Sequence, residues 1–238
     1  MGQNTLKGIF FDLGGTLATA YPSVTEHISQ TLADLGHPIP HREIASAAAI
    51  VSPDFDDPSN RGWSLSHERS YAFWIGYYTE LLQELKISPT ERATYALHIY
   101  NRLSRPQGYA LYPDAIPVLE QLAGAGYTLG LISNWEAWGM ELIPYLGISR
   151  YFPTQVLSGC VGLEKPDTAI FTLALAEANI APEHALYVGD SVRFDIEPAL
   201  AIGMRAVLID RHAERSDRGA STIRSLRELF SHESIRCS

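Results

Sequence analysis

The chain has 238 residues and a formal net charge of −9, from 18 Lys and Arg against 27 Asp and Glu. A surface of this sign repels nucleic acid, which argues against a nucleic-acid partner. Hydrophobic residues make up 46% of the chain, as in folded globular proteins, and no apolar run is long enough to cross a membrane. The two cysteines, Cys160 and Cys237, lie far apart without metal-ligand spacing, so we expect a reducing, cytoplasmic location.

The first predicted element is a buried strand at residues 6–11, a short apolar run that ends in Asp12. Gly14 and Gly15 follow, and paired glycines after an apolar run are typical of a turn. The sequence therefore predicts a carboxylate at the carboxyl end of a buried strand.

Residues 18–107 have a different pattern, without buried-strand runs. Helical periodicity is interrupted there by breaks that contain Gly and Pro. The predicted helices cover residues 24–35, 41–49, 65–85 and 89–103. We predict that residues 18–107 form a helical domain inserted after the first strand.

Beyond residue 107, apolar runs alternate with helical patterns. The predicted strands cover residues 127–132, 185–188 and 205–209, and the predicted helices cover 114–125, 136–146, 167–179 and 193–203. This alternation indicates an α/β domain with a doubly wound parallel sheet, built from residues 1–17 and 108–238. Sites in such sheets form at the carboxyl ends of the strands, so we expect Asp12, Ser133 and Asp190 to converge. The late arginines, from Arg211 onward, are interspersed with acidic residues and predict a solvated C-terminal helix.

Four motifs occur in order along the chain: DLGGTL at residues 12–17, LISN at 131–134, EKPD at 164–167 and VGDSVRFD at 188–195. Together they resemble the four motifs of the haloacid dehalogenase-like superfamily, in members with a helical cap between motifs one and two. The resemblance covers the whole chain and implies a Rossmann-like core with that cap at residues 18–107. The run at residues 66–87 is similar to the rhythmically-expressed-gene-2-like branch of the superfamily.

The resemblance also implies a reaction. Asp12 would be the nucleophile toward phosphorus, which a carboxylate can be when a cation neutralises the incoming phosphate. Asp12, Asp190 and the backbone carbonyl of Gly14 would hold Mg²⁺, a hard cation that prefers oxygen ligands. Asp195 would support this arrangement.

The remaining motif residues would bind the phosphate. Lys165 supplies a positive charge and Ser133 a hydroxyl donor for the phosphate oxygens, and Asn134 is a further candidate donor. Backbone amides of the Gly14, Gly15 and Thr16 turn can add donors, because glycine lets the chain approach closely. Positioning and charge stabilisation of this kind account for most of the catalysis of phosphoryl transfer.

Gly14 departs from the family pattern, because phosphatases of this superfamily usually carry a second Asp there as general acid and base. Such a group contributes roughly a hundred- to ten-thousand-fold in rate. We therefore expect slow breakdown of an aspartyl-phosphate, and the best turnover with acyl or aryl phosphates, whose leaving groups depart easily.

Three hypotheses stay open from the sequence. The chain is a Mg²⁺-dependent phosphatase for a small phosphorylated metabolite, with a substitute acid from the substrate or the cap; or it binds a phosphorylated ligand or a partner without useful turnover; or it cleaves a non-phosphate bond, as dehalogenases and phosphonate-cleaving relatives do. The cap candidates for the acid are Tyr21, Glu26, His27 and His67, and Lys86 is the cap lysine that a phosphonate-cleaving enzyme would need. The sequence does not indicate the natural substrate or the oligomeric state.

Overall fold

The computed structural model describes residues 5–52, 61–211, 221–232 and 235. The chain divides into two compact units, one made of Met1–Thr19 with Leu111–Ser238 and the other of Ala20–Ala110. We call the first the α/β unit and the second the helical unit. The role of the helical unit as a cap stays a prediction.

Within the described residues, the α/β unit holds a six-stranded sheet in the order β5–β4–β1–β6–β7–β8, with every neighbouring pair parallel. The strands are β1 Gly8–Phe11, β4 Thr128–Ser133, β5 Thr154–Leu157, β6 Ala185–Gly189, β7 Arg205–Ile209 and β8 Thr222–Ile223. The prediction of a doubly wound parallel sheet is confirmed. β5 and β8 were not predicted.

Strand β1 lies between β4 and β6 near the middle of this sheet. Phe11 pairs in register with Leu131 of β4 and with Val188 of β6. Because all three strands run the same way, the residues that end or follow them emerge at one edge. The topology thus places Asp12 between the ends of β4 and β6.

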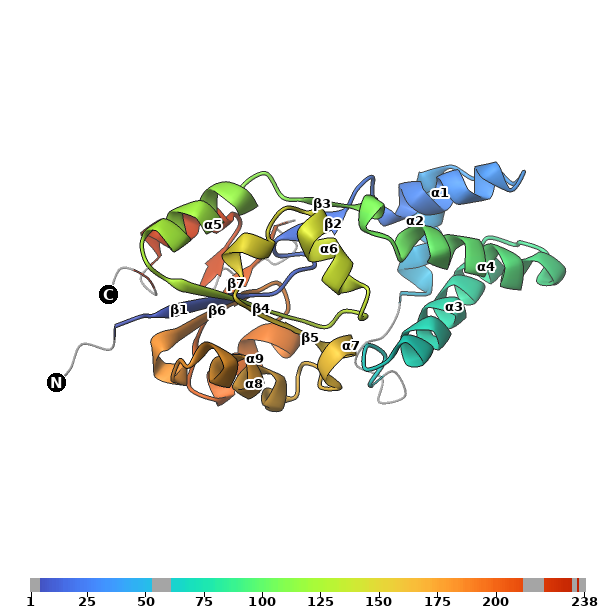
Figure 1. The fold of residues 1–238 in the computed structure, drawn as a ribbon. Coiled ribbons are helices and arrows are strands. Elements are labelled where there is room, and N and C mark those ends of the chain that lie inside the picture. The colour runs from blue at the N-terminus through green and yellow to red at the C-terminus, as the bar shows by residue number, and fades with distance from the viewer. Residues whose placement is uncertain (1–4, 53–60, 212–220, 233–234, 236–238) are drawn as a thin grey trace. The chain divides into compact units, whose positions relative to one another are not determined.

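Helices cover both faces of the sheet, with α5 on one face and α8 and α9 on the other (Figure 1). Phe10, Phe171 and Tyr187 belong to the buried cluster under α8, so the side chains of alternate strand residues fill this layer. The helices of the α/β unit, including short helical turns, have these bounds: α5 Ala115–Gly124, α6 Gly139–Tyr145, η3 Ser149–Tyr151, α7 Ser158–Val161, α8 Thr168–Ala178, η4 Pro182–His184, the π-helical η5 Val192–Ile196, α9 Glu197–Ala201 and η6 Leu226–Ser231.

The helical unit contains α1 Val24–Asp34, α2 His41–Ile50, α3 His67–Glu84, α4 Pro89–Leu103 and η2 Pro106–Gly108. Local signals explain the starts of α1 and α3: a capping box joins Ser23 to Glu26, and Ser66 caps α3. The buried faces share one apolar cluster that includes Ile28, Leu82 and Ile99. Strands β2 Ala18–Ala20 and β3 Tyr109–Leu111 pair in a separate sheet, and the division between the units falls within these two strands.

The predicted solvated C-terminal helix is wrong for the residues that the structure describes. Residues 221–232 contain β8 and the 3-10 helix η6, and the Arg211 side chain is only 8% exposed. Arg211 donates hydrogen bonds to the Thr16 carbonyl and the Asp114 carboxylate, so its guanidinium is bound by buried protein groups and not by solvent.

Cys160 is exposed with a free thiol, whereas Cys237 lies outside the described residues. In the described ranges, none of the helices combines the length and the apolar character that crossing a membrane requires.

Candidate functional site

The carboxylate of Asp12 is the centre of the polar cluster at the strand ends. It is buried and follows β1 directly. Ser133, the last residue of β4, donates a hydrogen bond from Oγ to Asp12 Oδ1 at 2.8 Å. Lys165 Nζ donates to the same oxygen at 2.8 Å. Both donors therefore orient the carboxylate through Oδ1, and neither bond uses Oδ2.

Lys165 is positioned by Asn134, which follows β4. The Asn134 side-chain oxygen accepts from the Lys165 backbone amide at 2.7 Å, and its Nδ2 donates to the Lys165 carbonyl at 2.9 Å. The amide thus fixes the loop that carries the lysine. A direct contact of Asn134 with phosphate stays a prediction.

A second carboxylate, that of Asp195, contacts the same ammonium group. Lys165 Nζ lies 2.5 Å from Asp195 Oδ1, and the Tyr187 hydroxyl lies 3.2 Å from Nζ and 3.1 Å from that oxygen. Burial alone would lower the pKa of Lys165, but the charges of Asp12 and Asp195 outweigh it and the pKa is raised. The two carboxylates therefore favour the charged form of Lys165.

Tyr187 was missed in the sequence, because an aromatic residue inside a buried strand has the pattern of a core residue. The available signal was its hydroxyl group, since a fully buried tyrosine usually needs a hydrogen-bond partner. Here the hydroxyl also donates to the Ile132 carbonyl at 2.8 Å. Tyr187 thus links β4, β6 and the Lys165–Asp195 pair.

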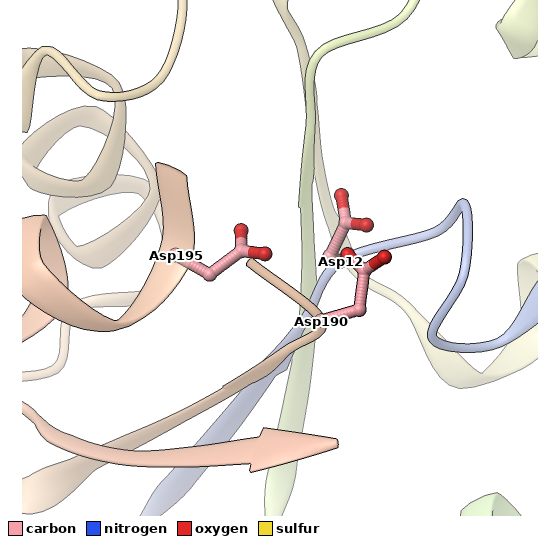
Figure 2. Close-up of side chains that lie close together, drawn as sticks. All are labelled: Asp12, Asp190 and Asp195. Atoms are coloured by element: carbon pink, nitrogen blue, oxygen red, sulfur yellow. The ribbon is translucent and has the colours of Figure 1, made fainter. Parts of the chain in front are cut away.

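Three carboxylates from separate elements point toward one region, those of Asp12, Asp190 and Asp195 (Figure 2). Each offers an oxygen, and these oxygens all lie within 4.8 Å of one another. Loss of hydration and the charges of Asp12 and Asp195 raise the pKa of Asp190 to about 7. The residue as a whole is solvent-exposed, so solvent screening reduces the energetic consequence of this shift.

This carboxylate group fits a hard divalent cation. The donors are all oxygen, as Mg²⁺ prefers, and their oxygens lie within 4.8 Å of one another. Asp195 already accepts from Lys165 through Oδ1 and from the Ser191 amide through Oδ2. The best candidates for direct ligands are therefore Asp12 and Asp190, and Asp195 fits a supporting place.

The turn after Asp12 is tightly constrained. Gly15 has a φ of +70°, and a Cβ there would overlap the Asp190 carboxylate, so the position requires glycine. The Gly15 amide donates to the Ala18 carbonyl at 2.9 Å and is used inside the turn. Phosphate binding by the backbone amides of Gly14, Gly15 and Thr16 stays a prediction. The Thr16 hydroxyl is buried.

The four candidate substitute acids lie in the helical unit. Hydrogen bonds from the Ser23 hydroxyl and amide hold the pKa of Glu26 below its usual range, which makes it a poor proton donor. His27 is buried, and the ring of His67 packs near Tyr71 and Tyr100. A role for any of them stays a prediction.

Comparison with known proteins places this site in a family. A model of the haloacid dehalogenase-like hydrolases matches residues 6–203, which is most of the chain. The chain belongs to the haloacid dehalogenase-like hydrolases. The predicted family is thus confirmed, whereas membership of the rhythmically-expressed-gene-2-like branch stays a prediction.

Relatives of this haloacid dehalogenase-like hydrolase include named phosphatases. A phosphoserine phosphatase of Thermus thermophilus is 34% identical over 69% of this chain and 68% of its own. A glyceraldehyde 3-phosphate phosphatase of Methanocaldococcus jannaschii is 30% identical over 94% of this chain and 95% of its own. These relatives support a phosphatase-like hydrolase.

The fold of this haloacid dehalogenase-like hydrolase is shared with solved structures. The HAD-hydrolase YfnB of Bacillus subtilis, in a crystal structure bound to magnesium, aligns over 95% of this chain and 98% of its own. The TM-score is 0.74 and the sequence identity 18%. At that identity the likeness concerns the fold alone.

Proposed function

We propose that this enzyme hydrolyses a small phosphorylated metabolite, a phosphate monoester or acyl phosphate, through an aspartyl-phosphate on Asp12 in a Mg²⁺ site. The observation that carries the proposal is the orientation of Asp12. Ser133 and Lys165 both hold Oδ1, so Oδ2 is the oxygen that can attack phosphorus. A carboxylate is a competent nucleophile when it is held and its charge is balanced in this way.

The reaction has two displacements. In the first, an Asp12 oxygen forms a bond to phosphorus while the bond to the leaving group breaks. In the second, water attacks the phosphorus, the bond between phosphorus and the Asp12 oxygen breaks, and inorganic phosphate leaves with the oxygen of the water, whose surplus proton passes to solvent. Lys165 stabilises the phosphate oxygens in both steps through its charge, and the Ser133 hydroxyl does so when it turns from Asp12 to donate to the phosphate. When bound by Asp12, Asp190 and the Gly14 carbonyl, Mg²⁺ supplies charge neutralisation for the incoming phosphate.

Lys165 can act in this way because its charge is maintained. Asp195 contacts Nζ on one side and Asp12 on the other, and Asn134 fixes the backbone. A preorganised cation of this kind costs no reorganisation during the reaction. The phosphate-binding roles of the Gly14, Gly15 and Thr16 amides and of Asn134 belong to the same proposal.

The chemical class of the substrate is supported by the named relatives, whose names refer to phosphoserine and glyceraldehyde 3-phosphate. Both of these compounds are alkyl phosphates, whereas the absence of a proton-donating side chain at Gly14 favours acyl or aryl phosphates for this chain. An alkyl leaving group needs a proton from elsewhere, whereas an acyl or aryl leaving group departs more easily without one.

The test is turnover of acetyl phosphate, 4-nitrophenyl phosphate and a metabolite panel with and without Mg²⁺. We expect turnover that needs Mg²⁺ and falls on the order of a thousandfold or more in Asp12→Asn. Asp34→Asn is the matched control, because that carboxylate pairs with Arg102 in the helical unit. Full activity in Asp12→Asn would falsify the aspartyl-phosphate mechanism.

The binding hypothesis is favoured by one observation, the missing acid at Gly14. It gives a different result in the same experiment: Mg²⁺ and phosphate bind, and no substrate of the panel turns over. The dehalogenase hypothesis instead requires halide release without Mg²⁺.

A further inference from the structure

An indole ring lies against Gly14. A Cβ added to Gly14 would lie 3.1 Å from Cζ3 of Trp135, with two more atoms of the same ring within 4 Å. Trp135 is two residues beyond Ser133, which bonds to Asp12, and Gly14 is two residues beyond Asp12. The ring therefore lies closer to this Cβ than ordinary packing allows, and any side chain at position 14 requires the ring to shift by a few tenths of an ångström.

The ring cannot withdraw easily. The Trp135 amide donates to Ser158 Oγ at 2.9 Å, and the Trp135 carbonyl accepts from the Gly159 amide at 3.0 Å. On the other side, a Cβ at Gly139 would lie 2.6 Å from Cδ1 of the ring, and the Trp138 ring lies 5.6 Å from it, edge to face. Backbone and ring are thus both held in place.

We propose that Trp135 is a specificity-determining residue of the phosphate site. Its ring stands in place of the missing acid and restricts turnover to phosphate compounds whose leaving group departs without a proton, acyl and aryl phosphates above all. This inference rests on the function proposed for Asp12. According to this inference, the effect of a substitution at Gly14 depends on the Trp135 ring. Replacing Gly14 with Asp alone therefore does not restore general acid–base catalysis.

The leaving group explains why this arrangement selects. A side-chain acid is worth roughly a hundred- to ten-thousand-fold for a poor leaving group and much less for one that is stable as an anion. An aromatic ring beside the phosphate offers a flat apolar face instead, and contacts between aromatic rings strengthen binding on the order of two- to tenfold. The proposed site therefore turns over alkyl phosphates poorly and favours phosphate compounds whose leaving group is flat and stable as an anion.

The first test needs no turnover. Gly14→Ala adds only the Cβ, and glycine-to-alanine exchange stabilises a protein when the space is free. We expect Gly14→Ala to lower the melting temperature in the wild-type background and to raise it in Trp135→Ala. Trp135→Leu is the second background, in case the alanine variant folds poorly. Gly124→Ala is the matched control, since a Cβ there meets nothing within 4 Å, and its effect stays the same in every background.

The second test measures leaving-group dependence. Phenyl phosphate and 4-nitrophenyl phosphate have similar shapes but different leaving groups. We expect Gly14→Asp to leave kcat/KM for phenyl phosphate unchanged or lower, and Gly14→Asp with Trp135→Ala to raise it at least about tenfold over Trp135→Ala alone. The gain for 4-nitrophenyl phosphate is smaller.

The outcomes separate the two proposals. If the wild type turns over substrate through Asp12 but Gly14→Asp has the same effect with and without Trp135, the proposed function stands and the role of Trp135 is overturned. The same holds if Gly14→Ala shifts melting equally in both backgrounds. If no variant, including the double variant, turns over any substrate although all melt cooperatively, the proposed function is overturned and the specificity role with it.

Discussion

The Asp12 carboxylate has two different surroundings: a lysine side, formed by Lys165 and Asp195, and a turn side, formed by the turn that contains Gly14. On the lysine side, charged and polar groups are paired at short distances, with Lys165 Nζ 2.8 Å from Asp12 and 2.5 Å from Asp195. On the turn side, Gly14 offers no side chain and an indole ring fills the space beside it. The side that we propose to stabilise charge in phosphoryl transfer is thus made of paired polar groups, whereas the side where family members usually carry an acid is apolar.

This difference shows that the two halves are separable in the fold. The lysine side depends on contacts among β4, β6 and the loop before α8, none of which involves residue 14. The turn side depends on Gly15 against Asp190 and on Arg211, which holds the Thr16 carbonyl. A change at Gly14 therefore need not disturb the placement of Asp12.

The largest expected effect comes from breaking the lysine side. Lys165→Met leaves two buried carboxylates without their shared cation, and removing one partner of a buried ion pair costs about 3–5 kcal/mol. We expect the free energy of unfolding, measured by urea titration in EDTA, to fall by that amount. Turnover falls as well, roughly a hundredfold or more.

Lys86→Met is the matched control for this change, because that side chain is 83% exposed and its loss is worth at most about 0.5 kcal/mol. Lys165→Arg keeps the charge and tests whether geometry matters beyond it. Equal urea midpoints for Lys165→Met and Lys86→Met would show that the buried pair does not hold the site together.

A smaller effect is expected on the turn side, from Arg211→Met. The guanidinium donates to the Thr16 carbonyl, pairs with Asp114 at 3.1 Å and lies 3.8 Å over the Tyr112 ring. Hydrogen bonds to charged groups contribute about 1.5–3 kcal/mol, so we expect a loss of about 2–3 kcal/mol of unfolding free energy. Arg224→Met, at an exposed arginine, is the control, and a loss no larger than in that variant would contradict the anchoring role.

The sequence predicted the central strands because β1, β4, β6 and β7 are continuous apolar runs, as strands buried on both faces must be. It did not predict the two edge strands. β5 contains Thr154 and Gln155, and β8 has only two residues. Strands this short and of mixed composition have too few residues for periodicity to separate them from loops.

The site was predictable in the placement of Asp12, Ser133, Lys165 and Asp190, which follows from motif order, and their chemical roles stay predictions. It was not predictable where a role depends on tertiary contact. Arg211 belongs to a basic run with the composition of a solvated surface, and its buried partners Thr16 and Asp114 are distant in the chain. Similarly, no local pattern indicates that the Trp135 ring meets Gly14, because the contact depends on how α6 and α7 hold the ring.

The smallest expected effect concerns pH and metal at Asp190. Its pKa in the folded chain, about 7, lies above the ordinary value of 3.8, so the folded state binds this proton more tightly than the unfolded state. The associated stability is fully present below pH 3.8, declines as pH rises, and is lost above about pH 7. In EDTA we therefore expect the melting temperature to fall across this window.

Mg²⁺ should offset this decline, because a cation that binds only the folded, deprotonated carboxylates stabilises the folded state. The increase in melting temperature on adding Mg²⁺ is then larger at pH 8 than at pH 5. Asp190→Asn removes the titrating group, so its melting temperature in EDTA varies less with pH than that of the wild type, and its response to Mg²⁺ is weaker. If the melting temperature of Asp190→Asn in EDTA varies with pH as much as that of the wild type, the pH dependence comes from other groups. The charge of Asp190 would then not destabilise the folded chain.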